Sequence, residues 1–99
     1  MSESPQIVAA AYFDDKVKSL AATRHGRKFS VGIISPGTYR FGTACAERMT
    51  VTSGSLKVQV EQADATVVVY PAGTYFEVAA NAGFQVTCDE HAAYLCEYL

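Results

Sequence analysis

The sequence has no tryptophan, two histidines and three cysteines among its 99 residues. The cysteines are odd in number and form no CxxC pair, which argues against a disulfide scaffold and favours a reducing cytosol. A metal site built from histidine needs at least one partner ligand at suitable spacing. We therefore interpret His25 and His91 as surface residues of loops.

Several sequence signatures are absent as well. The chain has no GxxxxGK[ST] or GxGxxG loop and no GxSxG elbow, which argues against the known nucleotide-cradling loops and a serine hydrolase. No apolar run approaches the ~20 residues that cross a bilayer. The polar, acidic start, residues 1–6, differs from a secretory signal. We therefore expect a cytoplasmic protein without a membrane partner.

Positive charge is missing from the C-terminal part of the chain. All eight Lys and Arg residues lie at or before Lys57, whereas residues 58–99 carry six acids. The net charge of −2 predicts no nucleic-acid partner. An anion site made of side chains must therefore use the first half, where two basic clusters occur: Lys16 and Lys18, then Arg24, Arg27 and Lys28. A loop at Gly26 and Arg27 is a candidate phosphate site, although solvated surface charge is the commoner explanation.

Hydrophobic residues make up 49% of the chain and recur mostly at every second position, with Gly, Pro, Asn and Asp between the segments. This alternation predicts half-buried strands, and turns at intervals of about 8 to 12 residues are typical of a sandwich or barrel. The run Val67–Val69 is apolar throughout, which predicts a strand covered on both faces. Since 99 residues suffice for one core, we expect a single all-β domain with little helix.

Two short motifs indicate the kind of barrel. Glu47 and Gly54 keep the Glu-to-Gly spacing of the first cupin motif, and residues 70–76 keep the Pro-x-Gly of the second. The positions at which metal-binding cupins carry histidine hold Thr43, Cys45 and Phe76. The motifs therefore resemble a cupin-type antiparallel β-barrel, or jelly roll, without its usual metal ligands. We expect neither a bound metal nor another cofactor.

Glu47 is the strongest candidate for a catalytic residue. It stands where cupins point a carboxylate into the barrel. Because desolvating a carboxylate is costly, a buried one is expected to have a specific role. Equally, Glu47 can be an exposed residue at the start of the strand, paired with Arg48 or Arg40. The chain is also rich in tyrosine. At a barrel mouth, tyrosines stack on a base or sugar and donate hydrogen bonds, although strand packing is the commoner role for each.

Taken together, these features are similar to the pyrimidine/purine nucleoside phosphorylase family of small cupins. The matching residues include Gly37-x-Tyr39-x-Phe41, Glu47-x-Met49-Thr50-Val51-x-Ser53-Gly54 and Tyr94-Leu95-Cys96-x-Tyr98-Leu99. The resemblance covers roughly residues 12–99 and leaves residues 1–11 as a variable N-terminal tail. It implies phosphorolysis, in which a purine or pyrimidine nucleoside and inorganic phosphate give a free base and a pentose 1-phosphate.

This reaction suggests roles for individual residues. The transition state at the anomeric carbon is expected to resemble an oxocarbenium ion, as in glycoside cleavage. A carboxylate such as Glu47 would bind the ribose hydroxyls and favour the developing positive charge. For substrate binding we select seven further residues: Tyr39, Thr43, Ser53 and Tyr94 for the nucleoside, and Lys16, Lys18 and Arg27 for the phosphate.

Two other functions remain open at this point. The barrel can bind a sugar or nucleoside without turning it over, or it can use a metal held by an unusual ligand set such as Cys45 with Glu47. An assay of phosphate-dependent base release separates the first from an enzyme, and metal analysis tests the second. We also expect a homodimer, because exposed strands need protection and the core is small.

Overall fold

The computed structural model describes residues 6–99, which form ten strands and no helix. Six strands make one sheet in the order β1-β2-β3-β10-β5-β8, and four make a second sheet in the order β4-β9-β6-β7. All their pairings are antiparallel. The strands are β1 (Val8–Tyr12), β2 (Val17–Arg24), β3 (Arg27–Ile34), β4 (Gly37–Gly42), β5 (Glu47–Ser53), β6 (Ser55–Val60), β7 (Val68–Pro71), β8 (Tyr75–Val78), β9 (Gly83–Cys88) and β10 (Ala92–Tyr98).

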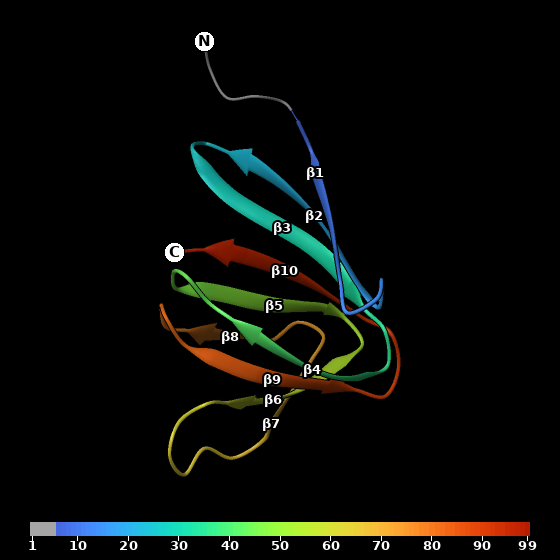
Figure 1. Cartoon of the computed structure of the whole chain (residues 1–99), viewed down its shortest axis with the longest axis vertical. Helices are drawn as coiled ribbons and strands as arrows, with labels where there is room; N and C mark the ends of the chain where they lie inside the picture. The colour runs from blue at the N-terminus through green and yellow to red at the C-terminus, as the bar shows by residue number, and fades with distance from the viewer. Residues whose placement is uncertain (1–5) are drawn as a thin grey trace.

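The two sheets lie face to face as the layers of a jelly roll (Figure 1). The antiparallel all-β fold predicted from the sequence is confirmed. In the described residues the pairings stay within each sheet, so the layers face each other without closing into a continuous barrel. Residues 6–99 likewise contain no helix long and apolar enough to cross a membrane.

The core fills the space between the sheets because apolar residues alternate along the strands. On β6, Leu56 and Val58 are buried while Lys57 between them is exposed. Residues directly opposite each other in an antiparallel pair share a face, so the register brings buried residues of neighbouring strands together. The largest fully buried side chains are Phe84, Ile34, Leu56, Val17, Val51 and Val86.

The spacing from Glu47 to Gly54 corresponds to the length of one strand. Glu47 begins β5, and Gly54 follows its last residue at φ 76°, where the chain turns into β6. Only glycine adopts this left-handed conformation at low cost. A Cβ on Gly54 would also lie 2.9 Å from the carbonyl oxygen of His91. The motif therefore places Glu47 at one end of β5 and the hairpin turn at the other.

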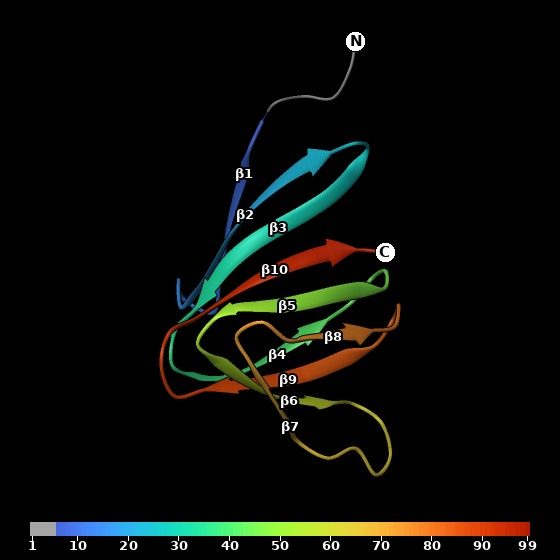
Figure 2. The same ribbon diagram turned by 180° about the vertical axis from the view of Figure 1, so that it is seen from behind.

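The larger sheet extends past the smaller one. Strands β1, β2 and β3 project beyond the four-stranded sheet, as both views show (Figure 2). The sheet also begins earlier than the predicted domain boundary at residue 12, because residues 8–11 of β1 pair with β2. Residues 1–5 of the predicted tail lie outside the described part of the chain.

The valine run lies at an edge. Val67, Val68 and Val69 expose 56%, 44% and 55% of their surfaces, so the predicted strand covered on both faces is wrong. β7 is the last strand of the smaller sheet and pairs with β6 on one side. An edge strand is covered less than a central strand of the same composition, because it has a neighbour on one side.

Candidate active site

A cavity of about 310 Å³ is lined by residues of both sheets. Its polar lining comes from the inner faces of β2, β3, β5 and β10 and from Arg40 of β4, and Tyr12, Phe13 and Phe41 contribute aromatic rings. The register explains why these residues converge, because Tyr98 lies opposite Glu47 and Cys96 lies opposite both Ser30 and Met49. The polar residues that line the cavity on β2, β3, β5 and β10 are Ser19, Ser30, Glu47, Tyr94, Cys96 and Tyr98.

Glu47 lines this cavity as a half-buried carboxylate. The Cys96 thiol donates a hydrogen bond to its Oε1 over 3.5 Å. Burial raises the pKa of Glu47 above its ordinary value, while the thiol and the charge of Lys28 oppose that rise. Both arginines that the sequence offers as surface partners pair elsewhere: Arg48 lies 2.8 Å from Glu77, and Arg40 lies 2.6 Å from Glu61. The structure therefore places Glu47 at the cavity rather than in a surface ion pair.

The cavity-lining groups of β10 beside Glu47 are neutral hydrogen-bonding groups. Burial raises the pKa of Tyr94 to about 12, and contact with the Ser19 hydroxyl partly opposes the rise. Burial and the nearby charge of Glu47 raise the pKa of Cys96 to about 12. Burial also raises the pKa of Tyr98, against a hydrogen bond with Ser30. At neutral pH these groups keep their protons, so Glu47 is the one anion among the lining residues named above.

Gly32 makes room for Tyr94. The two residues lie opposite each other on β3 and β10, and a Cβ on Gly32 would come within 2.5 Å of the Cζ atom of Tyr94 and overlap its hydroxyl oxygen. A tyrosine ring that covers a strand glycine in this way restores packing that glycine alone lacks. Gly32 therefore determines where the Tyr94 hydroxyl lies in the cavity.

Gly32→Ala is expected to displace Tyr94, lower the free energy of unfolding by about 1–3 kcal/mol through overpacking, and raise KM for a cavity ligand. Gly42→Ala is the matched control, because its Cβ would have no heavy-atom neighbour closer than 3.7 Å. Denaturant unfolding and steady-state kinetics of both variants measure the effects. Equal behaviour of the two variants would show that the position of Tyr94 does not depend on Gly32.

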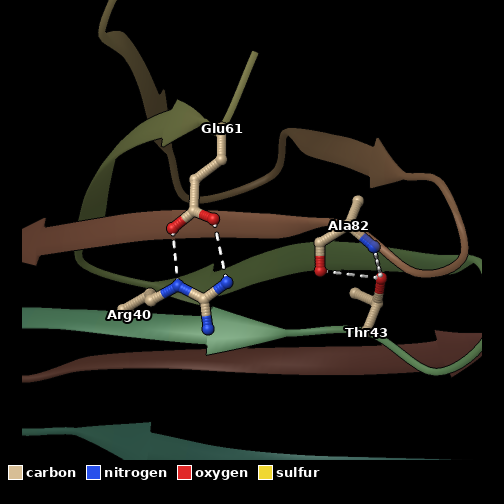
Figure 3. Close-up of polar contacts among 4 residues, drawn as sticks. All are labelled: Arg40, Thr43, Glu61 and Ala82. Carbon is tan, nitrogen blue, oxygen red and sulfur yellow. Dashed lines mark hydrogen bonds and ion pairs between the residues drawn. The ribbon is translucent and has the colours of Figure 1, made fainter.

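Two of the residues selected from the sequence have hydroxyls bonded to the backbone. Thr43 lies with its hydroxyl 2.6 Å from the carbonyl oxygen of Ala79, and it accepts a hydrogen bond from the Ala82 N–H over 3.0 Å (Figure 3). The Tyr39 hydroxyl donates to the carbonyl oxygens of Ser35 and Pro36, at 2.9 and 3.1 Å. Both side chains are buried, and neither lines the cavity. Their hydrogen bonds stabilise loops at the ends of β4.

The remaining selected residues are dispersed, except for Tyr94. Ser53 is exposed at the end of β5, and Lys16 is exposed in the turn before β2. Lys18 lies opposite the exposed Ile33, on the outer face of the sheet. Arg27 begins β3 at the tip of the β2–β3 hairpin. The structure therefore brings Glu47 and Tyr94 together at the cavity and places the other six residues outside its lining.

Sequence reasoning missed five polar residues of the cavity: Ser19, Ser30, Arg40, Cys96 and Tyr98. The alternation of Tyr94, Cys96 and Tyr98 along one strand is a signal that could have found two of them, because alternate residues share a face. Ser19 and Ser30 carry no such signal. They join the site only because of the register between β2, β3 and β10.

Comparisons with known proteins agree on the family of this chain. The family model described as "Pyrimidine/purine nucleoside phosphorylase" matches residues 7–98. The chain belongs to this family. A relative of the same name from Sorangium cellulosum is 45% identical over 89 residues, which span 90% of this chain and 95% of the relative.

Solved structures extend the comparison to the fold. A Vibrio parahaemolyticus protein described as of unknown function superposes with a TM-score of 0.87 at 44% identity, over 95% of this chain and 99% of its own. The Drosophila melanogaster CENP-C cupin domain superposes with a TM-score of 0.75 at 11% identity, over 95% of this chain and 76% of that chain. The second likeness concerns the fold alone, and it confirms the cupin fold predicted from the two motifs.

The residues at the three cupin ligand positions of this family member have other surroundings than a shared metal site. The Thr43 hydroxyl is bonded to the backbone, Phe76 is 6% exposed in the core, and Cys45 is exposed in the loop before β5. Within residues 6–99, no group of three His, Cys, Asp or Glu side chains is placed to hold an ion. Of these three positions, Cys45 alone offers the nitrogen or sulfur donor that transition metals favour, and a single such donor does not make the set of three or four ligands that a metal site needs.

Proposed function

We propose that this chain is a nucleoside phosphorylase of broad specificity, which converts purine and pyrimidine nucleosides and inorganic phosphate to free base and pentose 1-phosphate. The observation that carries the proposal is Glu47, a half-buried carboxylate of raised pKa that faces a cavity lined by neutral hydroxyls and by Arg40. The family of the chain supports the same reaction. At about 310 Å³ the cavity is at the lower end of the ~300–1,000 Å³ that ligand pockets occupy.

The reaction is a displacement at the anomeric carbon. A phosphate oxygen forms the new bond to this carbon, and the base leaves with the electron pair of the broken C–N bond and takes up a proton. Positive charge develops on the sugar as the C–N bond stretches. The Glu47 carboxylate faces this charge in a partly desolvated site, where an electrostatic interaction is stronger than in water. Phosphate is itself a competent nucleophile, so no activating base and no cofactor are needed.

The lining around Glu47 suits a sugar and an interchangeable base. The hydroxyls of Tyr94, Tyr98, Ser19 and Ser30 can donate to and accept from ribose hydroxyls. The rings of Phe13 and Phe41 lie with their centroids 5.6 Å apart on the other side of the cavity. Every base has a π-face, so stacking on such rings tolerates both purines and pyrimidines. This arrangement is consistent with loose base selectivity.

A phosphate-dependence assay over a panel of purine and pyrimidine nucleosides tests the proposal. We expect free base and pentose 1-phosphate in equal amounts, with no release of base when phosphate is omitted. Base release without phosphate would indicate a hydrolase. Saturable nucleoside binding without any turnover would instead support a non-catalytic binding cupin. Metal analysis of the same preparation tests for a metal-dependent enzyme.

We also propose a cytoplasmic homodimer. A groove of about 670 Å³ lies on the outer face of β1, β2 and β3 and has a mainly apolar lining. Leu20, Val31 and Ile33 line it and expose 50%, 43% and 56% of their surfaces. An exposed apolar face of this kind commonly marks an interface, and a second copy of the chain is the expected occupant. The three cysteines are unpaired, which fits a reducing compartment.

Light scattering tests the dimer. At micromolar concentration we expect a mass of twice the 10.6 kDa chain, and Ile33→Glu is expected to give the monomer because it places a charge in the apolar groove. Val69→Glu is the matched control. Val69 has nearly the same exposure, 55%, but it lies on β7 of the other sheet. A monomeric parent protein, or dimer loss in the control alone, would contradict this interface.

A further inference from the structure

The residues selected for phosphate from the sequence lie outside the cavity lining. Arg40 lines the cavity but is paired with Glu61, whereas Lys28 lies at the cavity edge, beside the lining residue Tyr98. Lys28 belongs to the same basic cluster as Arg27 and follows it on β3. Strand alternation places Lys28 on the face of β3 that carries the buried Ser30, and places Arg27 on the opposite face. Lys28 Nζ lies 5.0 Å from the ring centroid of Tyr98, which lines the cavity opposite Glu47.

The ammonium group of Lys28 is not paired with a carboxylate. Within residues 6–99, the ion pairs of Arg40, Arg48 and Lys57 occupy those three cations with Glu61, Glu77 and Asp89, whereas Lys28 forms none. Its ammonium group lies over the face of an aromatic ring, and its charge, after the Cys96 thiol, opposes the rise in the pKa of Glu47 that burial causes. Lys28 is therefore a cation within the field of the proposed catalytic carboxylate.

The proposed reaction needs a cation at this place. Phosphate must reach the anomeric carbon of a sugar that Glu47 also contacts, and two anions so close repel each other in a partly desolvated site. A positive charge beside both anions removes this repulsion. Other cations without ion pairs in the described residues lie elsewhere: Lys18 is on the outer face, and Arg24 lies over Phe29 on that same face, 5.7 Å from its ring centroid.

We propose that Lys28 binds the phosphate co-substrate at the open edge of the cavity, together with the hydroxyls of Ser30 and Tyr98. The inference rests on the proposed function and adds the residue that holds the second substrate. Lysine suits this task because its ammonium group is a compact charge on a flexible stem. The ring of Tyr98 lies beside the ammonium group, and the hydroxyls of Ser30 and Tyr98 offer neutral donors to the phosphate oxygens.

Lys28→Met tests the proposal, because methionine keeps an unbranched apolar side chain beside Tyr98 and removes the charge. We expect the KM for phosphate to rise by about 10- to 100-fold, the loss typical of one charged hydrogen bond, while the KM for the nucleoside changes little. Lys28→Arg keeps the charge and is expected to restore most of the phosphate affinity. Arg27→Met is the matched control, since it removes the same charge from the opposite face of the same strand.

Direct binding separates this inference from the proposed function. Calorimetry with inorganic phosphate alone is expected to show binding to the parent protein and to Arg27→Met, and a loss of at least tenfold in Lys28→Met. A parent protein that binds phosphate through Lys28 but releases no base would overturn the phosphorylase proposal and leave the binding site standing. Unchanged affinity in Lys28→Met, an equal loss in Arg27→Met, or no binding to the parent would overturn the assignment of Lys28.

Discussion

Glu47→Gln is expected to lower turnover with nucleosides by about 10²–10³-fold while the protein stays folded, because one electrostatic partner of the transition state is typically worth that much. Glutamine keeps the size of the side chain and can still accept the hydrogen bond from Cys96, but it carries no charge. The loss therefore measures how far the carboxylate favours the cationic sugar. Stopped assays of base release at saturating phosphate measure it.

The pH dependence gives this prediction a second measurement. Burial raises the pKa of Glu47 in the folded protein, so the parent enzyme is expected to lose activity as the pH falls through this raised value and the carboxylate takes up a proton. The glutamine variant has no such group and should lack this acidic limb. A variant that keeps the same acidic limb as the parent would assign the titration to another group.

Glu47→Gln is expected to lower turnover but not to lower stability. A carboxyl whose pKa is higher in the folded than in the unfolded chain contributes most stability below its unfolded value, and that contribution is lost as the pH rises through the folded value. At neutral pH the charged Glu47 thus destabilises the fold, and Glu47→Gln is expected to melt at or above the parent temperature. Glu77→Gln is the control, since Glu77 is exposed and paired with Arg48 on the surface. We expect it to keep the parent rate.

The fold was predictable from the sequence because its main signals are local. The alternation of Leu56 and Val58 with polar neighbours describes a strand with one buried face. The spacing between Glu47 and Gly54 describes the length of β5 and the turn after it. The valine run at 67–69 was predicted incorrectly as to burial, because composition does not say which strand lies at the edge of a sheet.

The cavity was only partly predictable, because its residues meet through pairings between distant strands. Glu47 and Tyr94 were identified from a motif and a residue type, and both line the cavity. Thr43 and Tyr39 were of the correct chemical type, but their hydroxyls are bonded to nearby backbone carbonyls. Arg27 and Lys28 show the difficulty most clearly. They are adjacent and equally charged, and only the register of β3 decides which one faces Tyr98.

Phe84→Ala is expected to cost about 3–5 kcal/mol of unfolding free energy, the largest loss of stability among the predicted substitutions. Phe84 is 1% exposed on β9, and its ring centroid lies 5.6 Å from that of Phe41 and 5.6 Å from that of Phe76. Alanine would remove both ring contacts and leave a cavity that the surrounding strands can fill only in part. For a domain of this size the melting temperature should fall by more than about 10 °C.

This substitution also tests how the aromatic core supports the site. Phe76 occupies the position of a cupin metal ligand, and its ring packs between Phe84 and Tyr70, whose centroid is 4.9 Å away. Phe41, on the other side of Phe84, lines the cavity. In Phe84→Ala the wall formed by Phe41 loses its support, so KM for nucleosides should rise even well below the melting temperature. Phe84→Leu refills most of the space and should show a smaller change in both the melting temperature and the KM for nucleosides. If Phe84→Ala melted at the parent temperature, or bound nucleosides as the parent does, the aromatic cluster would not be the support of the cavity wall.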